Sequence, residues 1–138
     1  MSKAEHADVP DALVGKLRKI CGALPEVVEE EAWAGTRWCI RKKNFAHVVQ
    51  IADGWPPAYA KAAGSKGPLT ILTFRSAIAE FDANAFAEPP FFRPVWFKDI
   101  AGVALGGDTN WQEIEELIAD SYCLLAPTKL AEQVQRPA

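Results

Sequence analysis

The chain has 138 residues, of which 49% are hydrophobic and 24% are charged, a composition typical of a folded globular protein and not of a disordered or fibrous one. Its 15 lysines and arginines against 18 aspartates and glutamates give a net charge of −3, which argues against a protein whose main task is to grip nucleic acid, because cations supply most of the sequence-independent affinity. The length predicts a single domain over residues 1–138, with 1–7 and 135–138 frayed and with a core that buries about two thirds of the unfolded surface.

The first predicted element is an amphipathic helix over residues 8–24. Its apolar residues are spaced by four, three and four positions, which places them on one stripe of a helix: Leu13, Leu17, Ile20 and Leu24. Asp8 is a candidate N-cap, and Pro10 is tolerated in the first turn because its missing N–H has no partner there. Pro25 ends the helix. An acidic run at 29–31 follows.

Between residues 37 and 51 the hydrophobic period changes to two, the period of a β-strand. Two strands are expected, over residues 37–41 and 45–51. In the first strand, Trp38 and Ile40 are predicted to point away from Arg37, Cys39 and Arg41. In the second, Phe45, His47, Val49 and Ile51 are predicted to point away from Ala46, Val48 and Gln50. A tight turn over 42–44 joins the strands, because Asn44 tolerates a positive φ. The segment therefore predicts a β-hairpin.

Two further strands and two short helices are expected in the middle of the chain. Residues 58–67 predict a short helical turn and a glycine-rich loop, and residues 69–74 predict a third, central strand because they are apolar and β-branched. A weak helix over 76–86 is broken by the prolines that follow it, and a last strand is expected over 100–105. The inner face of the weak helix is predicted to consist of Ile78, Phe81 and Ala85.

The last element is a capped amphipathic helix that begins near residue 109 and ends at Pro127. Thr109 and Gln112 have the spacing of a capping box. The predicted buried face consists of Trp111, Ile114, Leu117, Ile118, Tyr122 and Leu125. A final turn is expected over 129–134. Helix, strands and helix in this order predict an α+β fold, with a twisted antiparallel sheet and the N- and C-terminal helices packed on one of its faces.

Seven short segments give this chain a recognisable signature: Leu24-Pro25-Glu26, Trp33-Ala34-Gly35, Lys43-Asn44-Phe45-Ala46, Pro90-Phe91-Phe92-Arg93-Pro94, Asp108-Thr109-Asn110-Trp111, Ser121-Tyr122 and Ala126-Pro127-Thr128-Lys129-Leu130. In this order, over about residues 13–130, they resemble the MmcQ/YjbR family of small bacterial proteins. The resemblance implies a frataxin-like (CyaY-like) fold of order α-β-β-β-(α)-β-α. It also implies DNA binding by a double-wing mode that uses hairpins. The chain departs from the family at Lys42, where glycine is common.

The basic hairpin is the first candidate site. Four cations fall within seven residues, and the two arginines project from one face while the lysines lie at the tip: Arg37, Arg41, Lys42 and Lys43. Such a ribbon fits a DNA groove, with weak binding that salt would reduce. Three further cations are expected to assist: Arg75, Arg93 and Lys98. The alternative is that these lysines keep an exposed hairpin soluble and blunt the edge of the sheet.

A group of aromatic residues is the second candidate site. It combines two segments interrupted by proline, and its expected ligand-stacking residues are Trp55, Tyr59, Phe92 and Trp96. Aromatic rings beside Arg93 can stack on bases or on a flat ligand, and a protein partner is an equal alternative. The other interpretation is that these rings fold back as a small core beneath a loop.

Metal, cofactor and enzyme chemistry have little support in the sequence. The resemblance to frataxin-like proteins suggests a weak cation site on an acidic ridge formed by Glu26 and residues 29–31, but a solvated acidic surface explains the same pattern. His6 falls in the expected frayed terminus, and His47 is expected to be a hydrogen-bonded core or rim residue. No catalytic motif is present, so we expect a non-enzymatic protein with no metal and no cofactor.

Cysteine usage and hydropathy predict the compartment. The three cysteines are widely separated and lack Cys-x-x-Cys spacing, which favours reduced thiols. The first fifteen residues lack the apolar block of a signal peptide, and nowhere do eighteen apolar residues run together. We therefore expect a cytoplasmic protein with no membrane partner.

Overall fold

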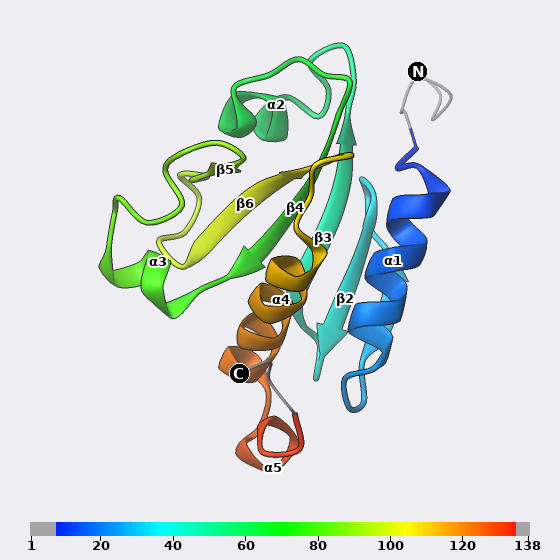
Figure 1. Cartoon of the computed structure of the whole chain (residues 1–138), viewed down its shortest axis with the longest axis vertical. Helices are drawn as coiled ribbons and strands as arrows, with labels where there is room; N and C mark the ends of the chain where they lie inside the picture. Colours follow the sequence, from blue (N-terminus) through cyan, green and yellow to red (C-terminus); the bar gives the residue numbers. More distant parts are fainter. Residues whose placement is uncertain (1–7, 135–138) are drawn as a thin grey trace.

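The computed structural model describes residues 8–134, and within this range six strands form one antiparallel sheet of order β1-β2-β3-β4-β6-β5 (Figure 1). The strands are β1 (Val28–Glu31), β2 (Thr36–Ile40), β3 (Lys43–Ile51), β4 (Leu69–Arg75), β5 (Phe91–Phe92) and β6 (Ile100–Leu105). The helices are α1 (Asp11–Gly22), α2 (Pro57–Ala63), α3 (Ala77–Phe81), α4 (Trp111–Leu125) and α5 (Thr128–Ala131). The predicted fraying of 1–7 and 135–138 concerns residues outside the described range.

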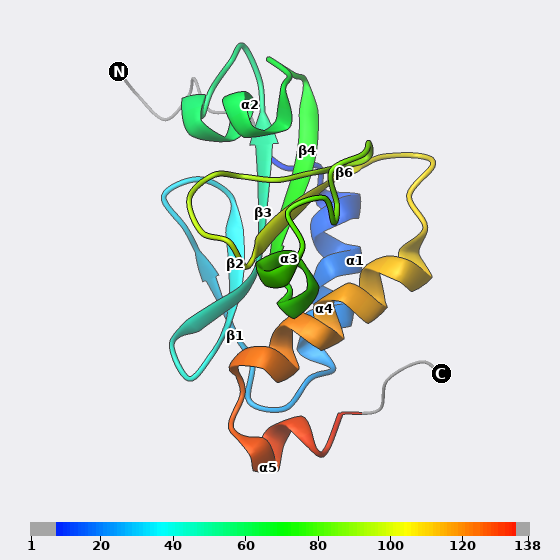
Figure 2. The same ribbon diagram turned by 90° about the vertical axis from the view of Figure 1, so that its left-hand side faces the viewer.

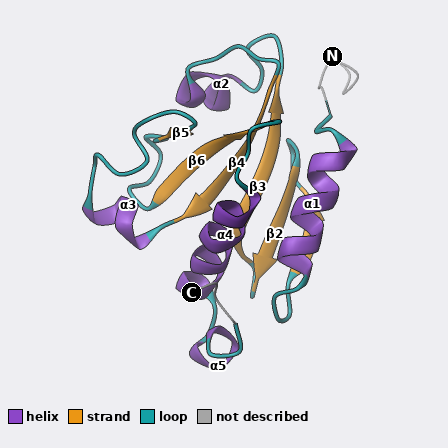
Figure 3. Ribbon diagram, viewed as in Figure 1, coloured by secondary structure: helices purple, strands orange, loops and turns teal. Residues whose placement is uncertain are grey.

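Helices α1 and α4 lie across the same face of the sheet, as Figure 3 shows. The main core lies between them and the strands, and its largest side chains are at most 2% exposed: Leu17, Trp38, Phe45, Leu72, Ile114, Ile118 and Tyr122. Complete burial of one such side chain contributes about 1.5–3 kcal/mol. The predicted α+β fold, with terminal helices on one face of an antiparallel sheet, is confirmed.

Helix α1 is shorter than predicted at its N-terminal end. It begins at Asp11, and its N-cap is Pro10, not Asp8. The Pro10 carbonyl accepts hydrogen bonds from the backbone N–H groups of Leu13 and Val14. Proline suits this place because its fixed φ is compatible with a helix start. The predicted end is nearly right, because the helix stops at Gly22, shortly before the proline at position 25.

The predicted hairpin is present, but its turn lies earlier in the chain. Arg41 and Lys42 form a two-residue turn with φ of 50° and 69°, the pattern of a type I′ hairpin, and Asn44 belongs to β3. The register also shifts between Trp38 and Cys39. Because of this irregularity the predicted alternation fails at Phe45, which joins the core beneath the helices.

The acidic run is a strand that the sequence analysis missed. Residues 28–31 form the edge strand β1, and Glu29 lies opposite Trp38 while Glu30 lies opposite Arg37. The indole N–H of Trp38 donates to Glu29 at 3.0 Å. Pairing with β2 thus overrides the low strand propensity of glutamate.

Two helix predictions need correction. In α3, Ile78 and Phe81 are 65% and 85% exposed instead of facing inward, and Ala79 is buried. At the start of α4 the N-cap is Asn110, whose side chain accepts from the Glu113 N–H. The Thr109 hydroxyl instead accepts from the N–H of Gly106, so the capping box is not formed. The predicted inner face of α4 is confirmed, with Ile114, Ile118 and Tyr122 buried and three partly buried residues beside them: Trp111, Leu117 and Leu125.

Candidate functional site

The second face of the sheet has a thinner cover than the first. Figure 2 shows α2 and neighbouring loops on the side away from α1 and α4. A small apolar cluster lies beneath them, made of Ala34, Val49, Ile51, Ala60, Ile71 and Phe92. Trp55 and Tyr59 pack against it and are only partly buried. We call this side of the sheet the aromatic face.

A buried histidine holds the cover of the aromatic face together. His47 on β3 is 9% exposed, and its Nε2 lies 2.6 Å from the carbonyl oxygen of Ala34. A carbonyl only accepts, so Nε2 carries the proton and donates. The Nδ1 atom then accepts from the Tyr59 hydroxyl at 3.3 Å. His47 therefore links the loop over residues 32–35 to helix α2.

The surroundings of His47 keep it neutral. Burial lowers its pKa, the hydrogen bond to Ala34 opposes this change, and the positive charge of Arg37 lowers the pKa further. Burial also raises the pKa of Tyr59, so its hydroxyl stays protonated and able to donate. Both ring nitrogens of His47 are engaged, which confirms the prediction of a hydrogen-bonded core residue. This histidine therefore acts as a structural link between the two segments.

Each of the two segments that His47 joins carries a tryptophan, and the two tryptophan rings are in contact. Trp33 directly precedes Ala34, and Trp55 lies four residues before Tyr59. Their ring centroids are 5.0 Å apart at an interplanar angle of 53°, so the pair forms a two-walled corner. Trp33 is 76% exposed. The Tyr59 ring makes an edge contact with Trp96 at 4.9 Å.

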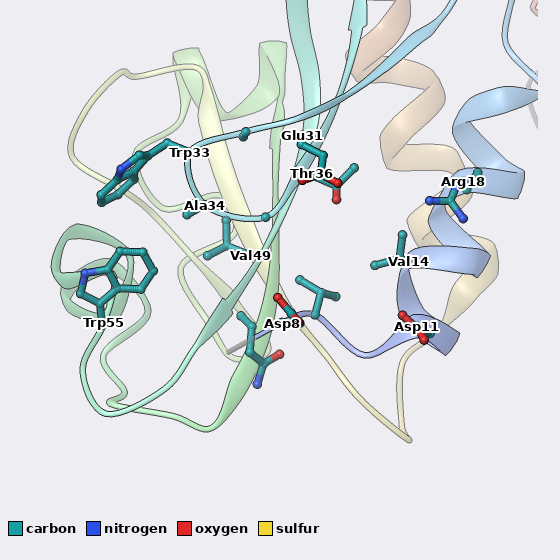
Figure 4. A pocket seen from close by; sticks show the side chains of 14 residues that line it. Asp8, Asp11, Val14, Arg18, Glu31, Trp33, Ala34, Thr36, Val49 and Trp55 are labelled. Atoms are coloured by element: carbon teal, nitrogen blue, oxygen red, sulfur yellow. The ribbon is translucent and has the colours of Figure 1, made fainter. Parts of the chain in front are cut away.

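A cavity of about 390 Å³ lies beside this tryptophan pair (Figure 4). It is formed where the N-terminal part of α1, the β1–β2 loop, the end of β3 and Trp55 meet. Its apolar lining comes from the two tryptophans and from Val9, Val14, Ala34 and Val49. We call this space the tryptophan cavity.

The charges around the tryptophan cavity are mainly negative. Three exposed carboxylates line it, from Asp8, Asp11 and Glu31. Among the described residues of its lining, Arg18 is the one cation. The guanidinium of Arg18 is held by both carboxylate oxygens of Glu29, each at 2.8 Å, and this partner lowers the pKa of Glu29. The cavity thus combines an aromatic wall with a net acidic rim.

The structure separates the aromatic residues proposed from sequence. Trp55 lines the cavity, whereas the Tyr59 ring makes edge contacts with both His47 and Trp96. Phe92 is 9% exposed and fills the space above Gly102, where a Cβ atom would overlap its ring. Phe92 is therefore a packing residue. Trp33 was recognised in the sequence only as part of a family motif, and the tertiary structure adds it to the site.

The arginines of the basic hairpin are paired with glutamates. The Arg37 Nε lies 2.7 Å from Glu30, and Arg41 approaches Glu26 to 2.9 Å. Lys42 and Lys43 are exposed at and next to the turn. The acidic residues upstream in the chain thus offset the charge of the arginine face, while the two lysines remain available to a partner.

The three assisting cations have different environments. Arg75 forms a double hydrogen bond with Asp99 at 2.8 and 3.0 Å, and its guanidinium lies over Phe97. Lys98 is exposed. Arg93 donates to four backbone carbonyls at 2.8–3.0 Å, those of Ala79, Asp82, Ala85 and Lys98. Arg93 therefore joins α3 to the loop that precedes β6.

The acidic ridge does not assemble a metal site within residues 8–134. No group of three histidine, cysteine or acidic side chains in this range is placed to hold an ion. Glu26, Glu29 and Glu30 instead hold arginines. His6 lies outside the described residues. Cys21, Cys39 and Cys123 are free thiols, and burial raises the pKa of Cys21.

Membrane insertion through a helix has no support in this structure. Among the described residues, no helix combines the length and the hydropathy needed to cross a bilayer.

Comparison with known proteins gives a family model and a fold. The model described as YjbR matches residues 22–124. A crystal structure of a protein from Pseudomonas syringae, determined by the Northeast Structural Genomics Consortium, is similar, with a TM-score of 0.57 and 15% sequence identity over 90% of this chain and 98% of that one. At this identity the similarity shows the fold alone. Among curated proteins, none matches the sequence.

Proposed function

The chain belongs to the YjbR family, and we propose that it is a non-enzymatic binding domain whose working surface is the tryptophan cavity, between the aromatic face and α1. The tryptophan cavity is the observation that carries this proposal. Its volume of about 390 Å³ falls in the usual range for small-ligand sites, which are lined by aromatic and apolar groups with a few polar ones. Trp33 and Trp55 supply the aromatic wall, and both lie on loops that a buried histidine holds in place.

Binding fits this cavity better than catalysis. Within residues 8–134, the titratable groups in its lining are three carboxylates and an arginine already engaged by Glu29. The same part of the lining contains no nucleophile with an adjacent base. His47, which is not among the lining residues, donates from one ring nitrogen to Ala34 and accepts at the other from Tyr59. The site can therefore bind a ligand through its shape, its aromatic rings and its charged groups.

Nucleic-acid binding by the basic hairpin is the alternative proposal, and it has weaker support. The arginines that were expected to contact phosphates are paired with carboxylates or bonded to backbone carbonyls. The proposal then depends on Lys42, Lys43 and Lys98. Each phosphate contact makes binding weaker as salt increases. An affinity for duplex DNA at low salt that is lost in the double variant Lys42→Glu/Lys43→Glu would favour the hairpin over the cavity.

The binding proposal is tested by following the tryptophan side chains during a small-molecule screen. We expect ligands to shift the indole N–H signals of Trp33 and Trp55 in NMR spectra, with assignments from Trp33→Phe and Trp55→Phe. The variant Trp33→Ala should weaken binding at least about tenfold, because one ring face is lost. Trp111→Phe is the matched control, since Trp111 lines a different groove beside α1. Ligands that never move the Trp33 and Trp55 signals would refute the proposal.

A further inference from the structure

We infer that the tryptophan cavity binds a small organic cation, specifically an alkylated ammonium ion. This inference rests on the binding function proposed above and names the chemical class of the ligand. It depends on two features that meet in one place. An aromatic corner lies on one side of the cavity, and three carboxylates lie around the remainder of the rim. Each feature alone is common on protein surfaces. Together they suit an ion that carries a positive charge and apolar alkyl groups.

The aromatic corner supplies the first half of the recognition. The ring of tryptophan attracts a cation to its face more strongly than those of tyrosine or phenylalanine, and quaternary ammonium ions are recognised by corners and cages of such rings. Trp33 and Trp55 both line the cavity, and their rings contact each other at an interplanar angle of 53° instead of stacking flat. Val9, Val14 and Val49 continue the apolar lining, which suits methyl groups on the ligand.

The rim charges supply the second half. Asp8, Asp11 and Glu31 contribute three negative charges to the lining. Arg18 does not cancel them, because its Nε and one terminal nitrogen already donate to Glu29 at 2.8 Å each. An anionic ligand would face three carboxylates and an occupied guanidinium. A cation is attracted by the same groups, and salt would weaken that attraction because the carboxylates are exposed.

A bare metal ion fits the cavity poorly. Hard cations need several oxygen ligands within about 2.0–2.6 Å. Within the described part of the chain, the acidic side chains do not gather into a group that could hold a metal. The cavity volume of about 390 Å³ and its indole wall suit an organic ion whose charge is spread over alkyl groups.

Choline and its neutral isostere, 3,3-dimethylbutan-1-ol, separate charge from shape. Both probes are titrated into the full chain while the indole signals of Trp33 and Trp55 are followed by NMR. We expect choline to bind at least tenfold more tightly than the alcohol and to lose affinity as sodium chloride is raised. Betaine, which carries the same quaternary group with an added carboxylate, should bind more weakly than choline.

Substitutions of the rim carboxylates then test whether these residues select a cationic ligand. The triple variant Asp8→Asn/Asp11→Asn/Glu31→Gln should lower the affinity for choline at least tenfold and leave the affinity for the alcohol unchanged. Glu115→Gln is the matched control, because Glu115 lies on the exposed surface of α4 beside a different groove. All four substituted residues are exposed, so circular dichroism and the melting temperature should match those of the parent.

The outcomes distinguish the two proposals. If the alcohol binds as tightly as choline and shifts Trp33 and Trp55, the cation inference is overturned while the binding function stands. If the triple variant keeps the parent affinity for choline, the rim does not select the charge and the inference also fails. If no organic probe, charged or neutral, shifts these two signals, the binding function itself is overturned.

Discussion

Two long helices, α1 and α4, cover one face of the sheet, whereas the other is covered by the short helix α2 and loops (Figure 1). The helix-covered face is filled by large apolar side chains, among them Trp38, Ile118 and Tyr122, each at most 1% exposed. The aromatic face instead contains a buried histidine and half-buried rings. This difference indicates that the helix-covered face supplies most of the stability, whereas the aromatic face leaves several rings partly exposed.

The largest predicted effect lies in the helix-covered core. Ile118→Ala should lower the free energy of unfolding by about 3 kcal/mol, because it removes a fully buried side chain and leaves a cavity. Leu124→Ala on the same helix is the control. Leu124 is 44% exposed, so its loss should cost less than about 1 kcal/mol. Urea denaturation measures both, and equal losses would contradict the comparison of the two faces.

Arg93 provides the next largest effect, because its side chain donates to four backbone carbonyls. Arg93→Met should lower the free energy of unfolding by about 2 kcal/mol, since it leaves four backbone carbonyls without their charged donor. Lys98→Met is the control, because the Lys98 side chain is exposed. Chemical denaturation of the two variants tests this, and a loss no greater for Arg93 than for Lys98 would show that α3 is held by other contacts.

The pH dependence of stability isolates the histidine link. The folded pKa of His47 lies below the ordinary value of 6.5, mainly because of burial. As pH falls through 6.5 toward the folded pKa, the unfolded chain binds the proton first, so the folded state loses stability in that window and gains none above it. The melting temperature should therefore fall between pH 7.5 and 5.5 by less in His47→Gln. An identical slope in the variant would assign the effect to other groups.

The smallest stability change is expected at the largest exposed ring. Trp33→Ala should alter the free energy of unfolding by less than about 1 kcal/mol, because Trp33 is 76% exposed. Thermal melts at neutral pH test this, with Trp38→Phe as the contrasting variant in the core. A large decrease in the free energy of unfolding in Trp33→Ala would show that this ring stabilises the fold. Trp33 would then belong to the packed core and not to the binding surface.

Hydrophobic periodicity predicted the main elements of the fold. The helix around Leu17, the hairpin and the terminal helix around Ile118 are present, because each buries one face that its own period reveals. The prediction failed for β1, where pairing with β2 makes a strand from glutamates. It also failed in α3, where the inner side chain is the small Ala79 and the large Ile78 faces outward. Short elements take their orientation from their neighbours.

The candidate site was only partly predictable. Trp55 was a candidate because it is a large aromatic residue followed by two prolines. His47 was correctly interpreted as a hydrogen-bonded residue. Trp33, Asp8 and Asp11 carry no local signal that joins them to Trp55. They come from segments more than twenty residues apart in the chain and meet only when α1 and the β1–β2 loop pack beside β3.

By itself, the sequence determined the family and the pattern of helices and strands, because periodicity and short motifs are local properties of a chain. Only the tertiary structure decided which charges pair and where a cavity opens. Arg37 meets Glu30 because of strand register, and Arg18 meets Glu29 because a helix lies over an edge strand. Coulomb attraction and burial depend on distance in space, and the folded arrangement sets that distance between residues far apart in sequence.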